Sequence, residues 1–190
     1  MHAVTLASLR TPAVLIDRAV ALRNIHRMQD AATAAGIRLR PHTKTHKSHV
    51  VARWQVDAGA SGICCAKLGE AEVFADAGFT DIRLPYPIHP SNADRVIALL
   101  DRTRLSFIVD HLGVAQQWSE AMVRAGREVD ILVKIDVGFH RCGIDPDTRD
   151  TLPTIKSIAA QLGRTEASIN ERLRDARRKM ETSSSREAAR

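Results

Sequence analysis

The fold is decided by residues 39–48, LRPHTKTHKS. They predict the end of a strand over 37–44, and a helical pattern over 48–58 follows. A lysine at the end of a buried strand is held in place and partly shielded from water. Because desolvation disfavours the ammonium form, such a lysine can lose its proton near neutral pH and attack a carbonyl group. A solvated basic turn, which binds an anion or nothing, is the other interpretation.

Apolar runs and helical patterns alternate along most of the chain. The runs are continuous rather than alternating, which is typical of strands buried on both faces. The pattern predicts a parallel sheet with helical crossovers. The predicted strands are 13–16, 37–44, 61–66, 81–86, 105–109 and 129–137, and the predicted helices are 19–35, 48–58, 69–77, 91–100 and 112–125.

Two α/β architectures fit this alternation, an open doubly wound sheet and a barrel. No glycine-rich phosphate fingerprint follows the first strand, which argues against a dinucleotide-binding sheet. Polar side chains follow several predicted strands, and in a barrel these strand ends form the rim that carries the chemistry. The sequence therefore favours a partial (β/α)8 TIM-type barrel of about five strands over 11–150. The rim candidates are Lys44, Lys67, Tyr86, Asp110 and the pair His140-Arg141.

The composition is that of a globular protein, with 44% apolar residues in a chain of 190. No run approaches the roughly 18 apolar residues of a membrane span, and the N-terminus lacks the pattern of a signal peptide. We therefore expect a cytoplasmic protein without a membrane partner. The adjacent Cys64 and Cys65 lie in an apolar strand pattern and are interpreted as small core residues. No His/Cys spacing typical of a metal site is present.

Residues 154–190 have a different character from the rest of the chain. They hold nine Lys or Arg against five Asp or Glu, so they carry most of the net charge of +6. A helix, a turn at Gly163 and a basic second helix capped by Thr165 form a helix-turn-helix outline over 154–180. A solvated amphipathic hairpin packed on the barrel is the preferred interpretation, and DNA binding is the alternative. Residues 181–190 are predicted to be disordered.

Four separated motifs resemble one enzyme family. In chain order they are TPAVLID at 11–17, RPHTKTHK at 40–47, GICCAKLGEAE at 62–72 and DVGFHRCG at 136–143. Together they resemble the N-terminal barrel of D-threonine aldolase and D-serine dehydratase. That barrel is of the alanine racemase type, found in the fold-type III enzymes that use pyridoxal 5'-phosphate. The resemblance implies lyase chemistry on a D-amino acid.

The resemblance implies that Lys44 forms the aldimine with the cofactor. Lys47 is the rival within the motif, but it lies beyond the predicted strand, so its amine would point less reliably into the barrel. Arg141 resembles the arginine that binds the phenolic oxygen of the cofactor, and a guanidinium there would keep that oxygen anionic. A salt bridge from Arg141 to Asp136 is the structural alternative.

His42 and His140 are the remaining candidates for the cofactor site. Either ring could line the pocket or relay protons, because imidazole titrates near neutral pH. Buried, hydrogen-bonded histidines without a catalytic role are the alternative.

The resemblance ends near residue 147, and counted from the strand that ends at Lys44, only five of the eight strands of a closed barrel are predicted. The divalent metal site of the family lies in the part that has no counterpart here, so no metal ligand is assigned. We therefore expect a truncated form with impaired lyase activity, and its exposed sheet edges favour association, such as homo-oligomers. The alternatives are a DNA-binding protein that uses the tail and a non-catalytic protein that binds the cofactor.

Overall fold

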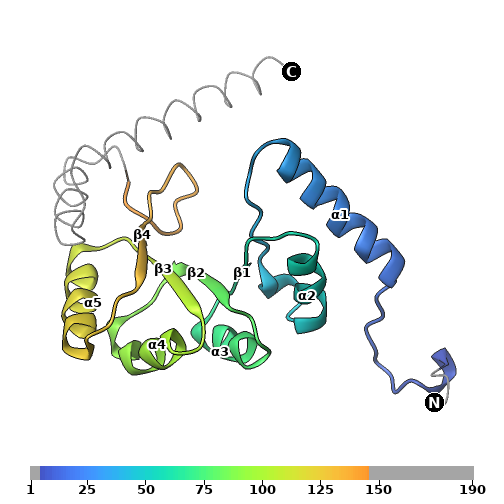
Figure 1. Cartoon of the computed structure of the whole chain (residues 1–190), viewed down its shortest axis with the longest axis horizontal. Coiled ribbons are helices and arrows are strands. Elements are labelled where there is room, and N and C mark those ends of the chain that lie inside the picture. Colours follow the sequence, from blue (N-terminus) through green and yellow to red (C-terminus); the bar gives the residue numbers. More distant parts are fainter. Residues whose placement is uncertain (1–4, 146–190) are drawn as a thin grey trace.

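The computed structural model describes residues 5–145 as alternating helices and strands (Figure 1). Two short 3-10 helices lie in loops that are important below, η2 (Thr43–Thr45) and η3 (Pro90–Asn92), and a third, η1 (Leu6–Ser8), lies near the N-terminus. The longer elements are α1 (Arg18–Ala34), α2 (His49–Asp57), β1 (Ile63–Cys64), α3 (Leu68–Asp76), β2 (Asp81–Pro87), α4 (Ala93–Leu100), β3 (Arg104–Val109), α5 (Leu112–Ala125) and β4 (Asp130–Val133).

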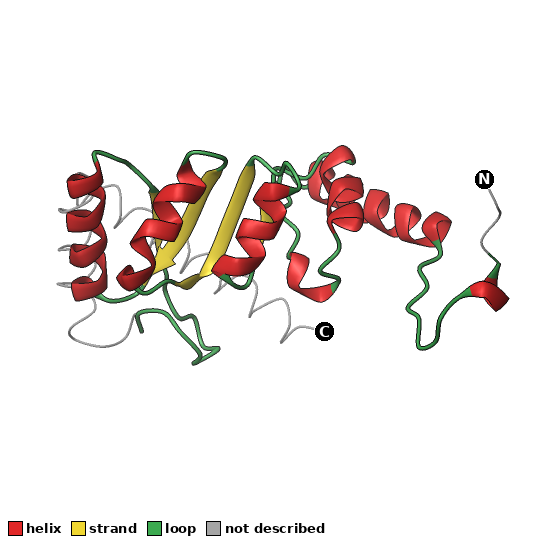
Figure 2. Cartoon of the chain, turned by 90° about the horizontal axis from the view of Figure 1, so that it is seen from below, coloured by secondary structure: helices red, strands yellow, loops and turns green. Residues whose placement is uncertain are grey.

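The four strands form one parallel sheet in the order β1-β2-β3-β4. Helices α3, α4 and α5 lie in a row along one face of this sheet (Figure 2). Each helix connects two neighbouring strands, as parallel pairing requires. The predicted α/β class and parallel sheet are confirmed.

The core lies between the sheet and these helices. Trp118 of α5 is fully buried, and its ring centroid lies 4.7 Å from that of Phe107 in β3. Its indole N–H donates a hydrogen bond of 2.8 Å to the carbonyl oxygen of Ile88. Because side chains alternate along a strand, Leu105 and Val109 point to the helices with Phe107, whereas Ser106 and Ile108 point to the opposite face. That opposite face leads to the site described below.

Two predicted strands are wrong. Residues 37–44 form an extended segment with a single parallel bridge, His42 to Cys64, before the chain turns into η2. Pro41 has no N–H to give to a ladder, although its carbonyl oxygen accepts from the Cys64 N–H at 2.8 Å. Residues 13–16 have no regular secondary structure and are exposed, with Val14 94% accessible, because no other segment of residues 5–145 pairs with them.

Several boundaries also differ from the prediction. The strands predicted over 61–66 and 129–137 shrink to β1 and β4, since their outer residues belong to the loops that turn into α3 and back toward Ile144. The helix predicted from Ser91 begins at Ala93. Ser91 does not cap it, because residues 90–92 form η3, for which the His89 side chain is the cap.

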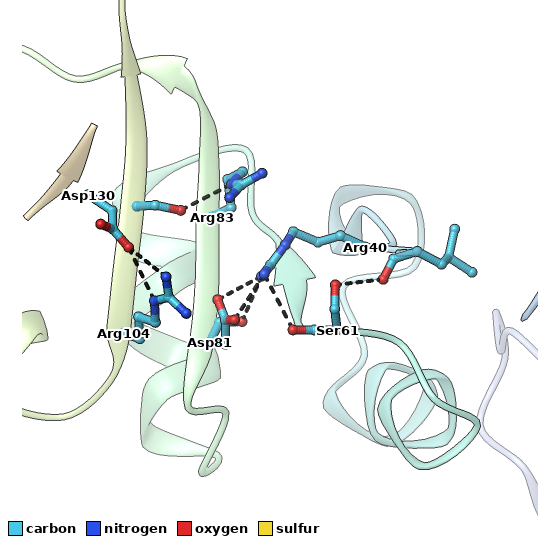
Figure 3. A network of polar contacts seen from close by, with 8 residues as sticks. Arg40, Ser61, Asp81, Arg83, Arg104 and Asp130 are labelled. Atoms are coloured by element: carbon cyan, nitrogen blue, oxygen red, sulfur yellow. Dashed lines mark hydrogen bonds and ion pairs between the residues drawn. The ribbon is translucent and has the colours of Figure 1, made fainter. Parts of the chain in front are cut away.

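A partly buried ion pair joins the extended segment to the sheet at the amino-terminal ends of the strands (Figure 3). The guanidinium of Arg40 binds both carboxylate oxygens of Asp81 at 2.8 and 2.9 Å and also donates to the carbonyl oxygen of Ser61. Only 15% of the Arg40 side chain and 28% of the Asp81 side chain are accessible. The pair of Arg104 and Asp130 in the same network is exposed.

The contrast between these two pairs gives a stability prediction. Arg40→Met should lower the free energy of unfolding by about 2 kcal/mol, because it leaves a poorly hydrated carboxylate and a carbonyl oxygen without their donor. Arg104→Met should change little, because the partners of an exposed pair are rehydrated when it breaks. Urea unfolding of both variants measures the difference, and equal midpoints would contradict it.

Two further sequence predictions concern membrane spans and the C-terminal tail. Among residues 5–145, no helix combines the length and the apolar character needed to cross a membrane. The predicted helix-turn-helix over 154–180 and the predicted disorder over 181–190 lie outside the described residues.

Candidate functional site

A cavity of about 780 Å³ lies at the carboxyl ends of the strands. It is bounded by the end of β2, the loops that follow the strands and the loop from 42 to 45. Its volume is within the range of small-molecule and cofactor sites. The lining residues are His42, Lys44, Ala66, Lys67, Leu68, Leu84, Pro85, Tyr86, Pro87, Ile88, His89, Asn92, Lys134 and Arg141. The structure thus brings together Lys44, Arg141 and His42, three of the four residues that the sequence predicted for the cofactor site.

Lys44 is held in a tightly anchored turn. The fully buried Thr43 hydroxyl donates to the Cys64 carbonyl oxygen at 3.0 Å, and the Thr45 hydroxyl donates to the His42 carbonyl oxygen at 3.2 Å. The Lys47 N–H closes the turn on the Thr43 carbonyl oxygen at 2.7 Å. The side chain before Lys44 is therefore tied to β1 and the one after it to the start of the turn, while Lys44 lines the cavity.

Lys47, the rival candidate, points elsewhere. Its ammonium lies 3.3 Å from a carboxylate oxygen of Glu70, and Lys47 does not line the cavity. The other oxygen of Glu70 accepts the Ala66 N–H at 2.8 Å. Burial alone would raise the pKa of Glu70, but this hydrogen bond and the contact with Lys47 together lower it. Glu70 is therefore an anion that holds Lys47 away from the cavity.

Lys44 itself is exposed to solvent in the part of the chain that the structure describes. The expectation of a partly dry amine at the end of a buried strand is wrong, because the strand is replaced by a short 3-10 turn at the open side of the cavity. Access to the amine, rather than its desolvation, is what the structure provides.

Arg141 is presented by a loop that folds around Asp136. One Asp136 carboxylate oxygen accepts the N–H groups of Gly138, Phe139 and His140 at 2.9 to 3.1 Å. These hydrogen bonds lower the pKa of Asp136, and the bond from the His140 N–H has the largest effect. Within residues 5–145, Asp136 makes its ion-pair contact with the His140 ring, so the alternative salt bridge from Arg141 to Asp136 is not formed.

His140 does not line the cavity with Arg141. Its side chain is 82% accessible, and its backbone adopts a φ of 52° in this loop. The loop is closed by the Gly143 N–H, which donates to the carboxylate of Asp110 at 3.1 Å. A Cβ atom at Gly143 would lie 2.7 Å from the Asp136 nitrogen, so the close approach requires glycine.

The weaker rim candidates have separate positions. Lys67 and Tyr86 line the cavity, whereas Asp110 holds the loop of Arg141 in place. Sequence reasoning missed Lys134, which follows β4 and also lines the cavity. The sequence feature that could have identified Lys134 is its place as a single cation in the apolar run 131–135. The register of β4 with β3 places it on the inner face of the sheet, since Leu132 pairs with Ile108.

The charge of the cavity has one sign. Three lysines and one arginine line it, and no carboxylate is among its lining residues within the described part of the chain. His42 contributes a neutral ring, because burial and the nearby Lys44 charge lower its pKa. Such a lining favours an anionic ligand.

The cysteines next to the site are core residues, as predicted. Cys64 and Cys65 are buried, and burial raises the pKa of both thiols, that of Cys65 to about 11. They remain protonated and apolar at neutral pH. Residues 5–145 contain no group of three or more His, Cys, Asp or Glu side chains that could hold a metal ion.

Comparison with known proteins places these features in a family. The family model described as alanine racemase, N-terminal domain, matches residues 16–166. D-threonine aldolase from Arthrobacter sp is 38% identical over 143 residues, which are 75% of this chain and 38% of the relative. D-threo-3-hydroxyaspartate dehydratase from Delftia sp. (strain HT23) is 41% identical over 152 residues, which are 80% of this chain and 40% of the relative. These matches confirm the family resemblance seen in the four motifs.

Solved structures agree in fold. D-threo-3-hydroxyaspartate dehydratase from Delftia sp. HT23 superposes with a TM-score of 0.78 at 39% identity, over 84% of this chain and 41% of that one. D-threonine aldolase from Filomicrobium marinum gives a TM-score of 0.75 at 36% identity, over 82% and 42%. The predicted partial barrel is confirmed, and the chain spans about two fifths of the length of these relatives.

Proposed function

Because the chain belongs to the alanine racemase N-terminal domain family, we propose that it binds pyridoxal phosphate covalently through Lys44 and serves lyase chemistry on D-amino acids with a β-hydroxyl group. One observation carries the proposal. Lys44 and Arg141, 97 positions apart in the sequence, line the same cavity at the carboxyl ends of the strands.

The residues present fit this cofactor. Pyridoxal phosphate is an anionic aldehyde, and the cavity offers an accessible amine together with three further cations, Lys67, Lys134 and Arg141. Its apolar walls, such as Leu84 and Ile88, suit a planar ring. The ion pair of Lys47 with Glu70 leaves Lys44 as the lysine of the motif that borders the cavity.

The cationic residues that line the cavity have separate roles. Lys44 would hold the cofactor covalently through its side-chain amine, which is the nucleophile of the site. Arg141 donates hydrogen bonds to an anionic oxygen and keeps it unprotonated. Lys67 and Lys134 hold the remaining negative charges of cofactor and substrate by charge pairing.

The bound cofactor supplies an electron sink for negative charge that develops at the α-carbon of an amino acid. The named relatives divide between aldolases and dehydratases. We propose the chemistry that they share, which is cleavage of a bond to the α-carbon of a β-hydroxy amino acid. We do not choose between the aldolase and the dehydratase reaction. The DNA-binding alternative rests on residues 154–180, which the structure does not describe, and it stays a prediction.

Arg141→Met provides one test of the proposed function. We expect the variant to bind pyridoxal phosphate at least about tenfold more weakly, because a charge-assisted hydrogen bond contributes roughly 1.5–3 kcal/mol. Absorbance titration of the full chain measures the dissociation constant. Arg124→Met is the matched control, since Arg124 lies on the exposed side of α5 and pairs with Glu120. Equal affinities of the Arg141 and Arg124 variants would contradict the assigned role.

A further inference from the structure

Four histidines within residues 5–145 make the same type of local hydrogen bond. In each, the Nδ1 atom of the ring accepts the backbone N–H of the residue two positions later. Three of them, His42, His89 and His111, are the caps of the helices η2, η3 and α5. The four bonds run from Lys44 to His42 at 3.4 Å, from Ser48 to His46 at 3.0 Å, from Ser91 to His89 at 3.2 Å and from Gly113 to His111 at 3.1 Å.

Two of these bonds lie on either side of Lys44. His42 accepts the N–H of Lys44 itself, and His46 follows the turn and accepts the N–H of Ser48, the cap of α2. His46 also ends η2, because its own N–H donates to the Thr43 carbonyl oxygen at 3.2 Å. The pair therefore sets the backbone at the start and at the end of the turn that presents Lys44.

An accepting Nδ1 atom needs a free lone pair, so a neutral ring must carry its hydrogen on Nε2. The surroundings of His46 match this tautomer. Its Nε2 atom and the Oε1 atom of Gln55 are both buried, and neither has a hydrogen-bond partner within residues 5–145. The Gln55 side chain interacts with the His46 ring. A hydrogen on Nε2 is the donor that this glutamine oxygen lacks.

We propose that His46, together with His42, is a positioning residue for Lys44, and that both rings do this only while they are neutral. The role rests on the proposed attachment of the cofactor at Lys44. Protonation places a hydrogen on Nδ1, which removes the acceptor of the Ser48 and Lys44 N–H groups. It also puts positive charge at the start of a helix, where the helix dipole disfavours it.

The groups around the two rings set the direction of the pH dependence. Burial is the main cause that lowers the pKa of His46, while Gln55 of α2 and the Ser48 backbone oppose it. For His42, burial and Lys44 lower the pKa, while Glu70 of α3 and the Cys64 backbone oppose it. Because both pKa values lie below 6.5 in the folded chain, the turn is intact above that pH. It is lost as the pH falls through the lowered pKa values.

The tautomer is tested first, and without the cofactor. Two-bond ¹⁵N–¹H NMR spectra of the full chain at about pH 8 distinguish a bare Nδ1 from a protonated one. We expect His46 to be the Nε2–H tautomer, and we expect its signal to disappear in His46→Asn, which assigns it. A hydrogen on Nδ1 of His46 would overturn the inference.

The positioning role is tested with three variants of the full chain. Pyridoxal phosphate is added at pH values from about 8 to about 5, borohydride fixes the linkage, and the label on Lys44 is quantified. His46→Asn keeps a side-chain acceptor that does not titrate, so its label should match the wild type at about pH 8 and exceed it at least about twofold once the pH has fallen through the lowered pKa of His46. His46→Leu lacks the acceptor and should be labelled less than either at about pH 8. His26→Asn, an exposed position on α1, should follow the wild type.

The outcomes separate the two proposals. An unlabelled wild type at about pH 8 would overturn the proposed function and with it the role of His46. A labelled wild type with the same pH profile as His46→Asn would overturn only the role of His46. If His46→Leu fails to fold, the comparison of His46→Asn with the wild type still decides the question.

Discussion

Lys44→Ala is expected to abolish covalent capture of pyridoxal phosphate by this chain. Lys44 is the lysine of the motif whose side chain borders the cavity from an anchored turn. Alanine removes the nucleophile, and the remaining lysines of the cavity, Lys67 and Lys134, come from other loops. The visible absorbance that the wild type develops with the cofactor should therefore be absent, and activity on β-hydroxy D-amino acids should fall at least about a thousandfold wherever the wild type shows it.

Lys47→Ala is the matched control for this prediction. It removes a lysine of the same motif, which is paired with Glu70 at 3.3 Å and does not line the cavity. The variant should keep the absorbance of the wild type. If Lys47→Ala loses the signal and Lys44→Ala retains it, the assignment of the two lysines is reversed.

Gly62→Ala is expected to have the largest effect on stability. Gly62 has a φ of +142°, a region that side chains rarely adopt, and it lies directly before β1, between the Arg40 side chain and the start of β2. An added Cβ atom would lie 2.7 Å from the Asp81 carbonyl oxygen and 2.2 Å from a nitrogen of Arg40. Strain and overlap with fixed backbone together should cost at least about 3 kcal/mol. That is a large part of the stability of a typical domain.

Gly36→Ala separates the effect of contact from the effect of backbone conformation. Gly36 also has a positive φ, +66°, but no atom lies within 4 Å of an added Cβ. Its cost should be about 1 kcal/mol, the penalty of the left-handed conformation alone. Urea unfolding followed by circular dichroism compares the two variants. Similar midpoints would show that Gly62 is not in close contact with Asp81.

Local sequence signals predicted the helices well. The pattern over 112–125 matches α5 at both ends, and Asp17 caps α1 by accepting the Val20 N–H at 3.0 Å. Helix periodicity and capping depend on residues that are close in the sequence, so the sequence alone is sufficient to locate a helix. A strand is different, because it exists only where another segment lies beside it. The apolar run at 13–16 has the composition of a strand but no partner within residues 5–145.

The candidate site was predicted in part for a related reason. The motifs identified Lys44 and Arg141, and the parallel topology explains why the structure brings them to one cavity. Lys134 could not be recognised from its neighbours, because the face to which it points depends on the register of β4 with β3. Desolvation of Lys44 was expected from a strand end, whereas the short turn of η2 leaves the residue exposed.

The most direct test of the central claim is a peptide map of the wild-type chain. The chain is incubated with pyridoxal phosphate, reduced with borohydride and digested, and the modified lysines are identified by mass spectrometry. The account predicts that one peptide, the one that contains Lys44, carries nearly all of the label. Label spread evenly over surface lysines, or concentrated on a lysine outside the cavity, would contradict it.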